Sequence, residues 1–245
     1  MKEVIEIDDD TSMQDAHFQL VENKPRRIIF CIDTSAEMAE ELKASANTGI
    51  SNTNLYHSSS RMESIQRFLK RFANINAMIG NRQDQYALMT LAENATWWFG
   101  FDTDIQKLSK EISFLDSEVQ EYNSTFDIKS IFREIEKNAD VRDDAYFYHV
   151  IVIYARTDVM PYLEQRDQIA HIRDLPNFVM DLLFLHDASD KVQDVYDFWD
   201  HLDSEVHQGW YYESGPVTGK DMLTRALAEL IAHPLQRGNQ EFISR

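Results

Sequence analysis

Apolar residues in this chain fall into two recurring patterns. Short uninterrupted runs, such as residues 26–33 (RRIIFCID) and 147–155 (FYHVIVIYA), have the length and composition of strands buried on both faces of a sheet. Between these runs, apolar residues recur every three or four positions, as Met62, Ile65 and Leu69 do, which places them on one face of a helix. The chain is therefore predicted to alternate between buried strands and amphipathic helices.

The same criteria assign elements along the whole chain. The expected strands are residues 26–33, 86–92, 96–101, 147–155, 178–186 and 207–214. The expected helices are residues 61–79, 105–115, 128–135, 163–172, 192–202 and 219–231. A tight polar turn through Glu93 and Asn94 joins two of the strands, and a connection that short requires antiparallel pairing. The remaining alternation predicts an α/β fold with a mostly parallel sheet, helices on both faces and one antiparallel edge strand.

Capping residues predict where several helices begin. Ser60 with Glu63, and Thr103 with Gln106, have the spacing of a capping box, in which each residue of the pair bonds the backbone of the other. The hydroxyl residues at 124–125 are expected to cap the helix that follows them.

The predicted organisation is an acidic flexible tail (residues 1–24), one domain (residues 25–233) and an extended C-terminal segment (residues 234–245). Residues 36–58 are mostly small and polar, which is typical of a long mobile loop. Pro234 ends the last helix because it cannot continue the backbone hydrogen bonding.

The chain has 245 residues, a length that suits one large α/β domain, and a formal net charge of −18. This surplus of acidic groups argues against nucleic-acid binding, which depends on cationic contacts with phosphate, and against docking on anionic membranes. The single cysteine excludes an internal disulfide and favours a reducing compartment, the cytoplasm or the nucleus. Because no apolar stretch approaches the roughly 20 residues that span a bilayer, we expect a soluble intracellular protein.

The turn after the first strand, Asp33-Thr-Ser-Ala-Glu37, is the first candidate for chemistry. A dinucleotide-binding fold would need glycines here, and none is present. A phosphohydrolase with an aspartyl nucleophile would need a second Asp at the position of Ser35. A von Willebrand factor A-type site would use Asp-x-Ser-x-Ser, with a Thr and an Asp from later loops, to hold Mg²⁺ through hard oxygen ligands. Asp33 and Ser35 match this last pattern.

The match is incomplete beyond these two residues. Thr125 is placed correctly for the second loop, but Glu37 replaces the second Ser and carries a longer charged arm. The later acid, Asp158, comes late after its strand, and Arg156 brings a positive charge to the site. The alternative interpretation is that these residues only cap local backbone. We therefore expect no metal and no cofactor, and we treat the following as degenerate metal-site positions: Asp33, Ser35, Glu37 and Thr125.

The segment after the last helix, Ala232-His-Pro-Leu-Gln-Arg-Gly238, is the second candidate. It offers an aliphatic side chain, an amide and a guanidinium beyond a helix stop, so it is either a plain helix terminator or a docking peptide.

Two polar residues inside strands, His149 and Asp181, are predicted to be sheet residues with satisfied hydrogen bonds. Residues 215–221 resemble a phosphate-binding loop, but they lack its spacing and its hydroxyl, and they predict a turn and a helix start.

Four segments together resemble a known family. They are Ile29-Phe-Cys-Ile-Asp-Thr-Ser-Ala-Glu-Met38, Asn123-Ser-Thr-Phe126, Val152-Ile-Tyr-Ala-Arg156 and, most specifically, Ala232-His-Pro-Leu-Gln-Arg237. On these residues the chain resembles the small von Willebrand factor A-like scaffold subunit of the BRISC deubiquitinase assembly. That family also serves the related breast-cancer-susceptibility-protein A complex of the DNA-damage response. The resemblance covers about residues 25–240.

The resemblance implies a non-catalytic subunit with a von Willebrand factor A-like domain. It implies direct binding to a scaffold subunit that contains a ubiquitin-E2-variant (UEV) domain. That scaffold carries a JAMM zinc protease and its pseudoenzyme partner, and the assembly cleaves lysine-63-linked ubiquitin chains in cytoplasm and nucleus. The implied docking residues are His233, Pro234, Leu235, Gln236 and Arg237. The rival hypotheses are a Mg²⁺-dependent ligand-binding domain and, with less support, an enzyme that uses Asp33 as nucleophile.

Overall fold

The computed structural model describes residues 24–42, 59–117, 125–214, 219–238 and 240. A six-stranded sheet runs through the molecule in the order β3-β2-β1-β4-β5-β6. Its strands are β1 (Arg26–Asp33), β2 (Gln85–Leu91), β3 (Ala95–Asp102), β4 (Phe147–Tyr154), β5 (Phe178–Leu185) and β6 (Tyr211–Ser214). Among the described strands of this sheet, only the pairing of β2 with β3 is antiparallel, so the antiparallel strand lies at an edge, as the sequence predicts.

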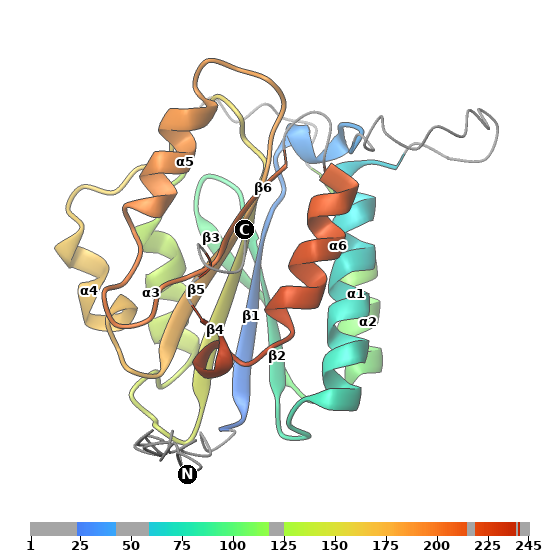
Figure 1. Ribbon diagram of the computed structural model, residues 1–245, viewed down its shortest axis with the longest axis vertical. Helices are drawn as coiled ribbons and strands as arrows, with labels where there is room; N and C mark the ends of the chain where they lie inside the picture. The colour runs from blue at the N-terminus through green and yellow to red at the C-terminus, as the bar shows by residue number, and fades with distance from the viewer. Residues whose placement is uncertain (1–23, 43–58, 118–124, 215–218, 239, 241–245) are drawn as a thin grey trace, which may run out of the picture.

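Helices cover both faces of this sheet (Figure 1). One face packs against α1 (Arg61–Ile79), α2 (Ile105–Ser113) and α6 (Gly219–Leu230). The other face packs against α3 (Lys129–Asn138), α4 (Asp167–Arg173) and α5 (Val192–Asp200). Each helix turns its apolar stripe to the sheet, and strand residues alternate between the two hydrophobic layers. The predicted α/β architecture is confirmed. Within the described ranges, no helix has the length and apolarity to cross a membrane.

The capping predictions have mixed outcomes. The Ser60 hydroxyl and the Glu63 carboxylate form the expected capping box at the start of α1. At α2 the expected cap is wrong, because Asp104 rather than Thr103 accepts the first free backbone N–H groups. At α3, Thr125 is not the cap, because the N-cap is Ile128, without a side-chain bond; residue 124 lies outside the described residues. At α2, Asp104 directly precedes the first helical residue, and its Oδ1 accepts the N–H groups of Gln106 and Lys107, so it takes the N-cap position expected for Thr103.

Two further expectations need correction. The last strand starts at Tyr211, not at 207, because register pairing with β5 begins only there; the Trp210 N–H donates to the Asp181 side chain instead of to a β5 carbonyl. The C-terminal segment is not extended throughout: Pro234–Gln236 forms a 3-10 turn, η2. The acidic tail, most of the loop at 36–58, the start of the turn at 215–221 and the last residues of the chain lie outside the described residues. Residues 36–39 form a short 3-10 turn, η1 (Ala36–Ala39).

Candidate functional site

Asp33 lies at the carboxyl end of β1, in the middle of the sheet, and is fully buried. This is where parallel α/β sheets place ligand-binding residues. Three backbone and side-chain donors reach its Oδ1: the Ser35 N–H at 3.0 Å, and Nε and Nη2 of Arg156, both at 3.1 Å. Its Oδ2 accepts the Ala155 N–H at 3.0 Å. Both carboxylate oxygens of Asp33 are therefore used inside the domain.

Arg156 follows β4, the strand beside β1, and its side chain is as buried as that of Asp33. Its Nη2 also donates to the carbonyl oxygens of Leu91 at 3.0 Å and Ala92 at 2.5 Å, at the end of β2. Its guanidinium lies 5.7 Å from the ring centre of Phe126. The guanidinium thus ties together the carboxyl ends of three neighbouring strands through one carboxylate and two carbonyls. Its positive charge compensates the buried carboxylate without a bound cation.

The residues around Asp33 do not fit a magnesium site. Mg²⁺ needs carboxylate oxygens that are free to coordinate it, and here they accept hydrogen bonds from protein donors. Ser35 Oγ is buried and has no hydrogen-bond partner in the described structure, whereas Thr125 is exposed. The late acid Asp158 is exposed and accepts a hydrogen bond from Ser189.

Glu37, the last degenerate position, lies half-buried in η1, after Asp33 and Ser35. The structure therefore brings Asp33 and Ser35 together and adds Arg156 to them. Within the described ranges, no group of three or more His, Cys, Asp or Glu residues could hold a metal ion.

The C-terminal segment folds back onto the opposite end of the sheet, as the red turn beside β4 shows in Figure 1. His233 is buried, its ring centre lies 5.1 Å from that of Phe147 on β4, and its Nδ1 accepts the Leu235 N–H at 3.2 Å. Pro234 and Leu235 are half-buried and Gln236 is exposed. Of the five expected docking residues, the structure leaves these three at the surface.

Arg237, the fifth docking residue, points inward instead. Its Nη1 lies 2.7 Å from Oδ2 of Asp181 on β5, and its side chain is only 4% exposed. Its Nε and Nη2 donate to the carbonyl oxygens of Ala232 and Leu230 at 3.1 and 3.0 Å. The guanidinium lies 5.1 Å from the ring centre of Trp210. Arg237 therefore holds the segment against the domain.

His149 completes this buried cluster. Its Nε2 lies 2.5 Å from Asp181 Oδ2, and its Nδ1 has no hydrogen-bond partner among the described residues. Burial lowers the pKa of His149 to about 4, against the opposing effect of the nearby carboxylate. Burial by itself would raise the pKa of Asp181, but the charges and hydrogen bonds of Arg237 and His149 lower it to about 2. At neutral pH the cluster is a neutral imidazole that donates to a carboxylate paired with a guanidinium.

Sequence reasoning identified the two strand residues as satisfied members of the sheet. This is confirmed for Asp181, whereas His149 is satisfied only at Nε2, because its buried Nδ1 has no partner among the described residues. It missed their common partner, Arg237, which lies 56 residues from Asp181 in the sequence. It also treated Arg156 only as a positive charge and missed its bond to Asp33. One signal could have suggested these Asp–Arg pairs. An acidic residue inside a buried strand needs a partner, and an Arg elsewhere in the sequence with no assigned partner is a candidate for it.

Comparison with known proteins places this geometry in context. The von Willebrand factor type A domain family matches residues 28–147. A protein of Xenopus tropicalis named BRISC and BRCA1-A complex member 1 is 28% identical over 228 residues, covering 88% of this chain and 67% of the relative. The Homo sapiens protein of the same name is 24% identical over 236 residues, covering 91% and 68%. The chain thus spans about two thirds of the length of these curated relatives.

Solved structures share the fold at low sequence identity. The SpRpn10 VWA domain superposes with a TM-score of 0.53 at 15% identity, covering 87% of this chain and 98% of that one. Proximal thread matrix protein 1 from the mussel byssus, described with a zinc-occupied MIDAS motif, has a TM-score of 0.56 at 13% identity, covering 85% and 45%. The sheet topology and these neighbours establish the same fold for this chain.

Proposed function

Because this chain belongs to the family of von Willebrand factor A-type proteins named BRISC and BRCA1-A complex member 1, we propose that it is a non-catalytic subunit of a deubiquitinase assembly. In this proposal it stabilises an assembly that cleaves lysine-63-linked ubiquitin chains and that acts in ubiquitin signalling and the DNA-damage response. Its direct partner is the UEV-containing scaffold subunit, which carries the JAMM protease and its pseudoenzyme partner. It works in cytoplasm and nucleus, without nucleic acid or membrane as a partner.

One observation carries the non-catalytic part of this proposal: both oxygens of Asp33 accept hydrogen bonds from buried protein donors. A nucleophile or metal ligand needs a lone pair directed at the substrate or the ion. Here Arg156 takes up the charge of Asp33 and joins three strand ends, so the usual ligand position of the fold serves its stability. This leaves the surface of the domain, rather than a reaction centre, to supply the function.

The surface we propose for docking is the turn at Pro234–Gln236. His233 and Arg237 flank this turn and anchor it to the domain from both sides. Between these anchors lie Leu235, which is half-buried, and Gln236, which is exposed; they offer an apolar and an amide group. A turn that is already ordered costs less conformational entropy when it binds. In this proposal Leu235 and Gln236 make the contact, while His233 and Arg237 keep the turn in its bound shape.

The test is co-expression of the full chain with the UEV scaffold subunit, the JAMM protease and its pseudoenzyme partner. We expect the wild-type chain to co-elute with the scaffold subunit in size-exclusion chromatography. Changing Leu235 and Gln236 together to Ala should weaken this association by about tenfold or more, because interface energy concentrates in a few central residues. Unchanged thermal melting of the variant shows that the domain itself is intact.

The matched control is Met78→Ala, which shortens an apolar side chain that is 76% exposed at the end of α1. Its association should equal that of the wild type. Failure of the wild-type chain to co-elute would contradict the proposed assembly. Two outcomes would contradict the docking role of the turn. One is that the Met78 variant no longer co-elutes with the scaffold subunit, and the other is that the Leu235 and Gln236 variant co-elutes as well as the wild type.

A further inference from the structure

Among the described residues, the outer edge of β6 is covered by the side chain of Gln240 and not by a strand. The Tyr211 N–H donates to Gln240 Oε1 at 2.9 Å, and Gln240 Nε2 donates to the Tyr211 carbonyl at 3.0 Å. These two bonds are the pair that a residue of a neighbouring strand would make. The carbonyl oxygens of Trp210 and Ser214 instead accept from Leu182 on β5 and from His186 directly after it. Since bonding directions alternate along a strand, the backbone of Glu213 points away from the sheet, like that of Tyr211.

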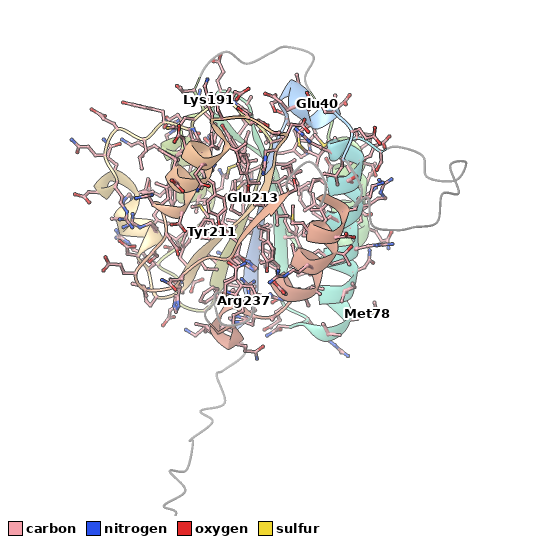
Figure 2. All side chains as sticks on the ribbon, turned by 45° about the horizontal axis from the view of Figure 1, so that its top comes forward. Glu40, Met78, Lys191, Tyr211, Glu213 and Arg237 are labelled. Carbon is pink, nitrogen blue, oxygen red and sulfur yellow. The ribbon has the colours of Figure 1, made fainter. Side chains whose placement is uncertain are left out.

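A cavity of about 630 Å³ opens beside this edge. One wall is the end of α5 and the following loop, and the other is formed by Pro234, Arg237, Gly238 and Gln240. Figure 2 shows Tyr211 and Glu213 along β6, with Arg237 below them. The cavity is large enough for several residues of an extended chain to lie against the strand. It is far from Asp33, because it borders β6 at the edge of the sheet while Asp33 ends a central strand.

The charges of this cavity are unbalanced. Asp200, Asp203 and Glu205 line it, and in the described structure none of the three forms a salt bridge. The cation in the opposite wall, Arg237, is already bound to Asp181. Burial raises the pKa of Asp203 to about 6, against two backbone hydrogen bonds that lower it. The carboxylates therefore favour a cationic group and disfavour an anion such as phosphate.

We propose that the β6 edge binds an extended segment of a partner protein that carries Lys or Arg side chains. The segment replaces the Gln240 amide, pairs with Tyr211 and Glu213 as an added strand, and directs a cationic side chain to Asp200 and Glu205. Main-chain bonds supply the affinity and the acidic wall supplies the preference for a basic sequence. This site adjoins the docking turn, since Pro234 lines the cavity, but its proposed bonds use the strand edge and the α5 loop instead of Leu235 and Gln236.

The test uses the full 245-residue chain and a defined probe. The probe is a fluorescent, acetylated and amidated heptapeptide of alternating Lys and Val, titrated at physiological salt and followed by fluorescence anisotropy. A second peptide has the same sequence with its three central residues N-methylated, which keeps every charge but removes the strand donors. We expect the N-methylated peptide to bind about tenfold more weakly, because it loses several main-chain bonds.

Variants of the chain separate local from general electrostatics. Asp200→Asn with Glu205→Gln should weaken the probe about tenfold. Asp116→Asn with Asp144→Asn removes two exposed carboxylates elsewhere and should change binding less than about twofold.

A third variant, Gln240→Ala, should bind the probe more tightly, because the Gln240 amide no longer occupies the backbone groups of Tyr211 at the strand edge. Equal binding of the two peptides, equal loss in the two double variants, unchanged affinity in the Gln240 variant, or no binding of the probe would each overturn the proposal. Co-elution with the UEV scaffold subunit is measured separately, so a failure of one proposal leaves the other intact.

Discussion

Arg156 turns Asp33 from a candidate ligand into a structural residue, because it satisfies the carboxylate that a metal ion would otherwise hold. A buried ion pair is costly to break, since removing one partner leaves the other charge desolvated and unpaired. We expect Arg156→Met to lower the free energy of unfolding by about 3–5 kcal/mol. Urea unfolding followed by tryptophan fluorescence measures the loss.

The control is Lys107→Met, which breaks an ion pair with Asp102 at the surface, where the Lys107 side chain is 64% exposed. Water and salt screen such a pair, so its loss should change the stability little. Asp33→Leu combined with Arg156→Met should recover much of the stability, because neither charge remains buried alone. Equal losses for Arg156→Met and Lys107→Met would contradict the structural role of Arg156.

The buried His149 predicts how stability depends on pH. In the unfolded chain its imidazole takes up a proton below about pH 6.5, whereas burial holds the folded pKa at about 4. Between these values the unfolded state binds more protons, so acidification from pH 7 to pH 5 favours unfolding. The difference corresponds to about 2 kcal/mol. We expect the wild type to lose about that much more stability between the two pH values than His149→Gln does, and equal losses would refute this assignment.

At the scale of elements, Gly209 shows how closely the chain before β6 approaches β5. A Cβ atom at this position would lie 1.9 Å from the carbonyl oxygen of Met180 on β5. The backbone of one segment must move to make room, because a carbonyl cannot rotate away as a side chain does. We expect Gly209→Ala to destabilise the protein by about 2 kcal/mol or more, measured by urea unfolding.

Gly100 on β3 is the matched control, since a Cβ atom there meets nothing within 4 Å. Gly100→Ala should leave stability unchanged or raise it by about 0.5 kcal/mol, because glycine is unfavourable inside a strand. If both variants lost the same stability, the general cost of replacing glycine, and not the contact with β5, would explain the result.

The elements that the sequence predicted best are those whose signals are local. The run at Arg26–Asp33 and the capping box at Ser60 depend on residues a few positions apart, and both are confirmed. The start of β6 was predicted too early. The contact of Gly209 with β5 joins residues far apart in the sequence, so no local pattern indicates it. The same holds for the candidate site. The position of Asp33 at the end of its strand could be predicted from the sequence, but its hydrogen bonds with Arg156 join residues 123 positions apart.

At the scale of the whole molecule, two buried ion pairs join distant parts of the chain at opposite ends of the sheet. Arg156 with Asp33 closes the carboxyl ends of the central strands. Arg237 with Asp181 fastens the C-terminal segment across the other end. The C-terminal segment, which the sequence predicts to lie outside the domain, thus contributes the positive charge of Arg237 that balances Asp181 in the sheet. Any partner that binds the turn at Pro234–Gln236 therefore binds an element that is continuous with the core.

This coupling predicts that a chain shortened to residues 1–233 is less stable than the full chain. Asp181 would keep its bonds to His149 and to the Trp210 N–H, but it would lose the guanidinium that balances its charge. We expect a loss of about 3–5 kcal/mol in urea unfolding. Adding Asp181→Asn to the shortened chain should restore part of the loss, since the amide is neutral and still accepts the backbone N–H. In the full chain the same substitution should destabilise, because it leaves Arg237 unpaired. A shortened chain as stable as the full one would show that the segment is a separate appendage.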